Sequence, residues 1–136
     1  MINIKQTVAT CASVIGIAAG TMLAFPATAS AATYGGQCGG GYNVIDSHNL
    51  KTGTVFLTYN GDQNCVVTVR NQPGAKQIIG AWLILSGVRP IVGGIEQHEY
   101  TTYAGPLYVH AKGHCIDWGG MLQDGDNWTA KNVHCG

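Results

Sequence analysis

The sequence is short of charge. Of its 136 residues only 10% are Asp, Glu, Lys or Arg, whereas about 25% is usual for soluble proteins. Seven basic and seven acidic residues cancel, and no basic run occurs anywhere along the chain. Neutralising phosphates requires clustered Lys and Arg, so the composition argues against a nucleic-acid partner. It argues equally against electrostatic docking to anionic lipid.

Motifs for nucleophilic catalysis are also missing. No serine lies in a G-x-S-x-G sequence, the turn that exposes the nucleophile of many hydrolases. Asp46, Ser47 and His48 are the residue types of a catalytic triad. Neighbours on a strand point to opposite faces of the sheet, however, so Ser47 cannot meet His48. We therefore expect a protein without catalytic residues.

The sequence offers no convincing metal or cofactor site. It contains no C-x-x-C pair, which zinc sites commonly use. His110 and His114 are four residues apart, and on a strand this spacing separates the side chains by roughly 13 Å. Asp124-Gly125-Asp126-Asn127 resembles the start of a calcium loop, but Trp128 occupies a ligand position and no closing Glu follows. We expect no metal and no cofactor.

Residues 1–31 have the features of a secretory signal peptide. Lys5 precedes an uncharged, mostly apolar stretch from Thr7 to Phe25, and Ala29-Ser30-Ala31 supplies a cleavage pattern of small residues. The stretch is close to the ~20 residues of a transmembrane helix, so a retained anchor is the alternative. The cleavage pattern favours removal before Ala32. The mature protein is then expected outside the cytoplasm and free of the membrane.

The mature chain, residues 32–136, is short enough for a single domain. An even number of cysteines in a small exported domain implies disulfide bonds, because such domains need covalent staples. Residues 32–136 contain four cysteines, namely Cys38, Cys65, Cys115 and Cys135.

Turn positions favour one of the three possible connectivities. If the chain reverses at Asp124-Gly125-Asp126, then Cys115 and Cys135 fall opposite each other. The same reasoning at Lys51-Thr52-Gly53 places the two N-terminal cysteines opposite each other. We favour the pairs Cys38–Cys65 and Cys115–Cys135, although the sequence alone does not exclude the other two arrangements.

Short segments of alternating polarity, bounded by turn residues, predict an all-β fold. Seven or so short strands at this spacing indicate a small antiparallel β-sandwich or barrel. The apolar run Ile78–Leu85, which contains Trp82, is expected to be a strand buried on both faces. The expected strand segments are Asn43–Leu50, Thr54–Tyr59, Cys65–Arg70, Ile78–Leu85, Gln97–Tyr103, Leu107–Ala111, Cys115–Leu122 and Trp128–His134.

Aromatic residues crowd the C-terminal half of the chain. They have two interpretations: packing in the core and across strands, or an exposed patch that stacks on sugar or adheres to another surface. Under the second interpretation the candidate contact residues are Tyr100, Tyr103, Tyr108, Trp118 and Trp128.

Several motifs in order resemble one known family over the whole mature chain. The resemblance is to the spore-associated protein A family of streptomycetes and related actinobacteria, whose pattern the four cysteines match. It implies an exported protein found with the spore envelope, and it supplies no catalytic residues. The motifs are Ala32-Thr33-Tyr34-Gly35-Gly36-Gln37-Cys38-Gly39, Thr54-Val55-Phe56-Leu57-Thr58-Tyr59-Asn60, Asn64-Cys65-Val66-Val67-Thr68-Val69, Tyr100-Thr101-Thr102-Tyr103-Ala104-Gly105-Pro106, Cys115-Ile116-Asp117-Trp118-Gly119-Gly120 and His134-Cys135-Gly136.

The leading functional hypothesis is a non-catalytic extracellular protein of the cell or spore surface. Its expected partner is an envelope component such as a polysaccharide. Two alternatives stay open: a carbohydrate-binding module, and a secreted protease inhibitor that uses the glycine-rich loop around Cys38. The sequence leaves the ligand and the oligomeric state open.

Overall fold

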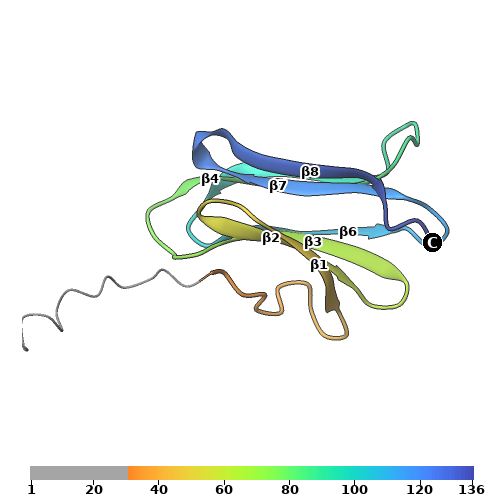
Figure 1. The fold of residues 1–136 in the computed structure, drawn as a ribbon, viewed down its shortest axis with the longest axis horizontal. Helices are drawn as coiled ribbons and strands as arrows, with labels where there is room; N and C mark the ends of the chain where they lie inside the picture. The colour runs from red at the N-terminus through yellow and green to blue at the C-terminus, as the bar shows by residue number, and fades with distance from the viewer. Residues whose placement is uncertain (1–30) are drawn as a thin grey trace, which may run out of the picture.

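The computed structural model describes residues 31–136, so the predicted leader, residues 1–31, lies outside the described part except for its last residue. Two four-stranded antiparallel sheets pack face to face (Figure 1). Sheet A has the strand order β1-β2-β3-β6, and sheet B has the order β5-β4-β7-β8. The strands are β1 Asn43–Asn49, β2 Gly53–Tyr59, β3 Gln63–Arg70, β4 Gln77–Leu85, β5 Gly93–Tyr100, β6 Tyr103–His110, β7 Ile116–Leu122 and β8 Asp126–Val133.

The predicted all-β sandwich is confirmed, with eight strands. The alternation expected in β2 and β3 is also confirmed, because neighbouring residues enter different apolar clusters. Leu57 and Val66 belong to the main core between the sheets, whereas Phe56 and Val67 belong to a second cluster on the outer face of sheet A. The two central strands of sheet A, β2 and β3, are therefore buried on both faces.

The boundary between β5 and β6 was predicted at the wrong place. We expected Ala104-Gly105-Pro106 to divide two strands, but the chain turns at Thr101-Thr102 and β6 continues through Gly105-Pro106. The pairing of β6 with β3 shifts register between Val66 and Thr68, which marks a bulge. A bulge in an edge strand accepts proline, and Gly105 has φ of 96°, a conformation that favours glycine.

β4 is buried on one face, not on both as the sequence indicated. Ile79, Ala81 and Leu83 are fully buried between the sheets. Trp82 and Ile84 point the other way and remain partly exposed on the outer face of sheet B. A continuous apolar run does not reveal this difference, because it contains no polar residue to mark the open side.

A fully buried hydrogen bond joins the two sheets. The Thr68 hydroxyl in β3 donates to the Gly80 carbonyl in β4 at 2.8 Å, and both groups are buried. Gly120 makes this approach possible: a Cβ there would stand 2.0 Å from the Thr68 hydroxyl oxygen. The glycine thus serves close packing of two layers.

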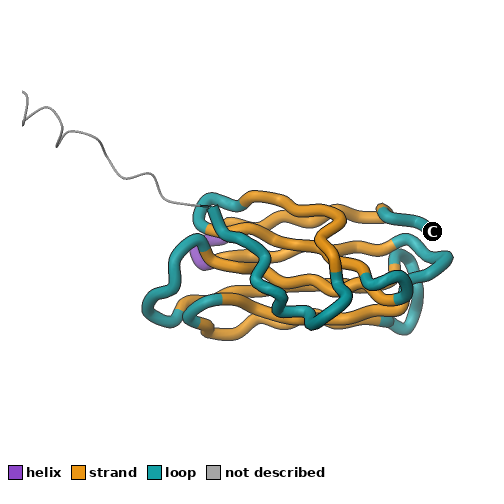
Figure 2. Tube along the Cα trace, turned by 90° about the horizontal axis from the view of Figure 1, so that it is seen from below, coloured by secondary structure: helices purple, strands orange, loops and turns teal. Residues whose placement is uncertain are grey.

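The segment of residues 32–42, here called the N-terminal strap, runs across the outer face of sheet A (Figure 2). It has no regular secondary structure. The side chains of Ala32, Tyr34 and Tyr42 pack on the cluster that contains Phe56 and Val67. The strap therefore forms a third layer that hides this face from solvent.

The structure contains both predicted disulfides, Cys38–Cys65 and Cys115–Cys135. The second joins positions just beyond the ends of β7 and β8, close to the register expected from the turn. The reasoning for the first bridge was wrong, because Cys65 lies on β3 opposite Thr58. Cys38 lies on the strap and not on a paired strand, so the bridge fastens the strap to sheet A.

Candidate functional site

The outer face of sheet B carries a tryptophan that lies along the sheet. Trp82 in β4 is opposite Gly119 in β7, which is opposite Thr129 in β8. A Cβ at Gly119 would stand 2.5 Å from the indole nitrogen of Trp82, so the ring occupies the space above this glycine. Nε1 of Trp82 donates a hydrogen bond to the Thr129 hydroxyl at 3.0 Å. The indole therefore extends across β7 and remains partly exposed.

The neighbouring row repeats this arrangement with methionine. Met121 in β7 is opposite Gly80 in β4, and a Cβ at Gly80 would stand 2.8 Å from the Met121 side chain. The thioether chain therefore lies over Gly80. The row continues to Gln97 in β5 and Asn127 in β8, which are both exposed.

These two rows form an uncharged surface, here called the sheet B platform. Charged groups lie in the rows on either side: Glu99 is opposite Ile78, Asp117 is opposite Ile84, and Lys131 is exposed on β8 two residues beyond Thr129. Asp117 accepts hydrogen bonds from the Ser86 hydroxyl and from the backbone of Asn132. The platform consists of Ile95, Trp82, Gly119 and Thr129 in one row and Gln97, Gly80, Met121 and Asn127 in the other.

Trp118, a predicted contact residue, is fully buried at 0% exposure, which corrects that prediction. Its ring fills the space between the two sheets because β7 presents it inward, opposite Ala130. Trp128 is half-buried and forms a T-shaped pair with Trp118 at 4.9 Å between ring centroids. It also stacks on His48 at 4.1 Å between ring centroids, with the ring planes 5° apart. Both tryptophans thus serve packing in this structure.

The three predicted tyrosines do not gather into one patch. Tyr108 on β6 is 40% exposed. Its ring packs against that of Tyr42 in the strap, with 5.6 Å between the ring centroids. Burial is the main cause that raises the pKa of Tyr42, with Tyr108 adding to it. Tyr103 packs on the cluster beneath the strap. Tyr100 packs against the main core, and burial, followed by the Glu96 carboxylate, raises its pKa.

Sequence reasoning missed Trp82 because the apolar run around it favoured a buried strand. The signal was present in the glycines. Gly80 lies two residues away on the same face of β4, and Gly119 precedes Gly120 in β7. Glycine in a strand interior marks a place where something approaches the backbone closely. Here the approaching groups are Met121 and Trp82.

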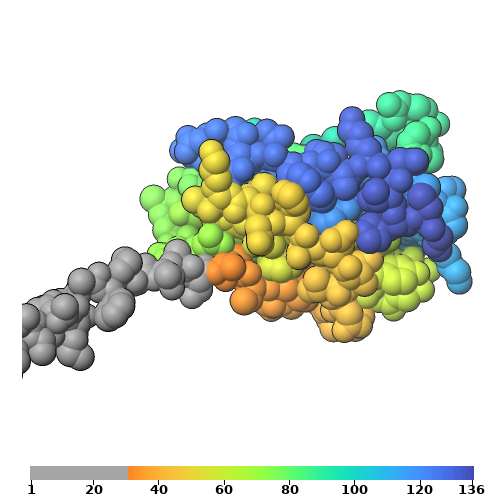
Figure 3. Space-filling view, viewed as in Figure 1, coloured from red at the N-terminus to blue at the C-terminus, as the bar shows by residue number. Residues whose placement is uncertain are grey.

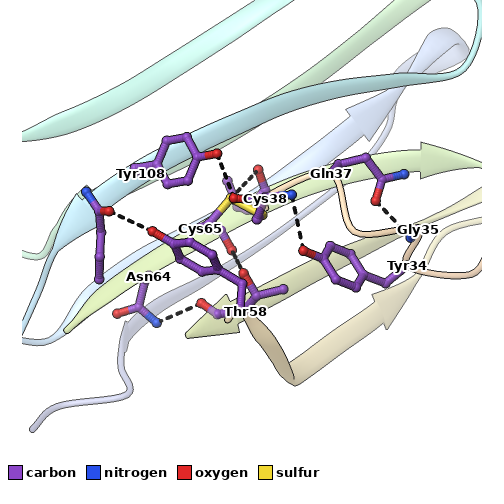
Figure 4. The surroundings of a disulfide bond; sticks show 11 residues. Tyr34, Gly35, Gln37, Cys38, Thr58, Asn64, Cys65 and Tyr108 are labelled. Atoms are coloured by element: carbon purple, nitrogen blue, oxygen red, sulfur yellow. Dashed lines mark hydrogen bonds between the residues drawn. A yellow bond between two sulfur atoms is a disulfide. The ribbon is translucent and has the colours of Figure 1, made fainter. Parts of the chain in front are cut away.

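The surroundings of the Cys38–Cys65 bridge show how the strap is fixed (Figure 4). The backbone N–H of Cys38 donates to the Tyr34 hydroxyl at 3.1 Å. The Tyr108 hydroxyl donates to the Cys38 carbonyl at 2.9 Å. Beneath it, the Thr58 hydroxyl donates to the Cys65 carbonyl. Cys38 is consequently only 4% exposed.

Two hollows lie at opposite ends of the sandwich. The one beside the C-terminus measures about 230 Å³ and is lined by residues that include Tyr59, Lys112 and His134. The other measures about 370 Å³ and is lined by turn residues that include Arg70 and Gln123.

Among residues 31–136 no group of three or more His, Cys, Asp or Glu side chains could hold a metal ion. That part of the chain also has no helix long and apolar enough to cross a membrane.

These features define a disulfide-bridged β-sandwich with one outer face covered by the strap and the other left open. The chain belongs to the spore-associated protein A family, as its motifs indicated. It is 40% identical over 132 residues to Spore-associated protein A of Streptomyces coelicolor, covering 89% of this chain and 82% of the relative. No family model matches the chain, and no solved structure matches it significantly.

Proposed function

We propose that this protein is a secreted, non-catalytic component of the cell or spore envelope. The observation that carries the proposal is the family relationship, because the relative is named for its association with spores. The two disulfides support a place outside the cytoplasm, where oxidised cysteines persist. Charged residues are scarce. This fits a protein whose surface contacts other envelope material and is not surrounded only by solvent.

The placement of the polar side chains supports a non-catalytic role. His48 stacks on Trp128, and its neighbour Ser47 lies exposed. The Ser86 hydroxyl donates to Asp117, and Asp117 also receives the backbone N–H of Asn132 at the irregular end of the β7–β8 pair. The carboxylate therefore fixes the chain where the ladder of β7 and β8 is interrupted.

The structure does not favour the protease-inhibitor alternative. An inhibitory loop has to project so that it can enter the cleft of an enzyme. The strap instead lies along sheet A, and Cys38 is held from two sides by Tyr34 and Tyr108. Cys38 itself is buried between exposed glycines on either side of it.

Fractionation of the native host tests the proposal. Washed envelopes, culture medium and cytosol are probed with an antibody, and the mass of the recovered protein is measured. We expect the protein in the envelope fraction, beginning at Ala32 and resistant to alkylation at all four cysteines. A variant that begins at residue 32, and therefore lacks the leader, should stay in the cytosol. If the protein expressed with its leader is recovered only in the medium or only in the cytosol, the proposal is contradicted.

A further inference from the structure

We propose that the sheet B platform binds neutral polysaccharide, with the indole of Trp82 as the stacking surface. This inference deepens the proposed envelope association and rests on it for its biological setting, because it names the class of ligand. The platform occupies the outer face that the strap does not cover, so among the described residues nothing shields it.

The indole is fixed in place across β7 on the outer face of sheet B. Gly119 leaves room beneath the ring, and Thr129 holds the indole nitrogen. Pyranose rings have faces of C–H groups, and these are attracted to the electron-rich face of an aromatic ring. Because the ring is already held in place, little side-chain freedom is lost on binding, and this lowers the free-energy cost of association.

Polar groups lie at the right places to accept and donate hydrogen bonds to sugar hydroxyls. Strands are spaced about 4.8 Å apart, so a row across four strands measures about 14 Å, enough for a short run of sugar units. Gln97 stands at one end of the platform, and Asn127 at the other. The Thr129 hydroxyl accepts from Trp82, which leaves its own proton free to donate.

The charge of the surface selects the kind of glycan. Neither row of the platform carries an acidic or basic side chain. The nearest carboxylates belong to Glu99 and to Asp117 in the flanking rows. Lys131 also lies on the exposed face of β8, so the flanking charges have both signs and attract neither an acidic nor a basic polymer strongly, whereas a neutral polymer does not depend on them.

A second copy of this chain is the other conceivable occupant. Ile95 is 64% exposed, and Ile91 and Val92 are also exposed. The centre of a stable protein interface is well-packed and depleted in polar groups. In the platform, Trp82 and Met121 on the central strands are only partly exposed, and the amide and hydroxyl groups of the edge strands flank them. This arrangement suits a narrow sugar chain better than a broad apolar interface.

The test uses the secreted, oxidised protein and pull-down on insoluble cellulose and chitin, which are neutral, with peptidoglycan and an acidic polysaccharide as charged comparisons. We expect retention on at least one neutral polymer that is insensitive to salt. Trp82→Ala should weaken retention about tenfold or more, as loss of a central aromatic contact does. Trp128→Phe is the matched control, because Trp128 packs on His48 away from the platform, and it should bind normally.

A second variant guards against misfolding of the first. Gln97→Ala combined with Asn127→Ala changes only exposed side chains, so the fold should persist, and retention should fall several-fold. No retention on any neutral polymer, unchanged binding by both variants, or retention only on the acidic polymer at low salt would overturn the proposal. A dimer that Trp82→Ala dissociates, seen by light scattering, would overturn it in favour of self-association.

The two proposals fail separately. If the Trp82→Ala variant stays with washed envelopes as well as the unaltered protein does, the platform is not the attachment site, although envelope association stands. If the unaltered protein binds glycan in the pull-down but never copurifies with envelopes, the envelope association is wrong and the binding surface stands.

Discussion

Three glycines on two neighbouring strands show how single residues shape both sides of sheet B. Gly80 and Gly119 have no side chain and so leave room on the outer face, where Met121 and Trp82 lie over them. Gly120 leaves room on the inner face, where the Thr68 side chain approaches from sheet A. A side chain at any of the three positions would collide with its neighbour.

Replacing Gly120 tests the inner contact. A Cβ there would stand 2.0 Å from the Thr68 hydroxyl oxygen and 2.9 Å from a methyl carbon of Val55. We expect Gly120→Ala to lower the free energy of unfolding in urea by about 1–3 kcal/mol, the usual cost of overpacking. Gly40→Ala is the control, since a Cβ at Gly40 meets nothing within 4 Å. Equal stability of the two variants would show that the sheets are not in close contact here.

Tyr100 makes a pH-dependent contribution to stability. Burial, followed by the negative charge of Glu96, raises the pKa of its phenol above the ordinary 10.0. The folded protein therefore holds this proton more tightly than the unfolded chain does. The contribution is complete below the unfolded pKa and is lost as the pH rises through the folded pKa.

Phenolate absorbance and alkaline unfolding curves check this expectation. The free energy of unfolding should fall above about pH 10, and the fall should be smaller in Tyr100→Phe than in the unaltered protein. Titration of Tyr100 in the folded protein at or below its value in denaturant would be the contrary result.

At the scale of elements, the strap behaves as a lid fastened by one covalent bond. The Cys38–Cys65 bridge closes a loop with a sequence separation of 27 residues. Its removal by Cys38→Ala with Cys65→Ala should cost about 3–4 kcal/mol on the chain-entropy account. Loosening of the strap should also uncover Phe56, which is 8% exposed in the intact protein.

The second bridge provides the matched comparison. Cys115→Ala with Cys135→Ala opens a loop with a separation of 20 residues, so the loss of stability should be similar. The cluster beneath the strap stays covered in this variant. We therefore expect strong binding of a hydrophobic fluorescent dye only when the first bridge is removed, and equal dye binding by both variants would speak against the strap as a separate lid.

The sequence predicts the strands themselves well, and strand geometry alone then places successive side chains on opposite faces. In the expected strand Thr54–Tyr59, Leu57 faces the main core and Phe56 faces the outer cluster. The strap has no such period, so nothing in its sequence shows that it covers sheet A. The apolar run in β4 likewise does not reveal that the face of the strand with Trp82 meets solvent. Alternation reports the direction of side chains along a strand, but not which segment lies above them.

At the scale of the whole molecule, the sequence left a sandwich and a barrel open. The structure is a sandwich because β1 and β8 are edge strands of different sheets. Their surfaces meet along a seam of side chains (Figure 3). His48 stacks on Trp128, and the His134 ring lies 2.8 Å from the Asp46 carboxylate. Side chains thus close this flank where a barrel would have backbone pairing.

The positions of the two bridges have a mechanical consequence. A tension applied between Ala32 and the C-terminus would pass through each disulfide and bypass the residues enclosed by it. Strands β1 and β2 lie inside the first loop, and β7 and β8 lie inside the second. Only the region between Cys65 and Cys115, with the short tails, could lengthen under load. A reducing agent would release the remaining contour length in a single-molecule stretching experiment.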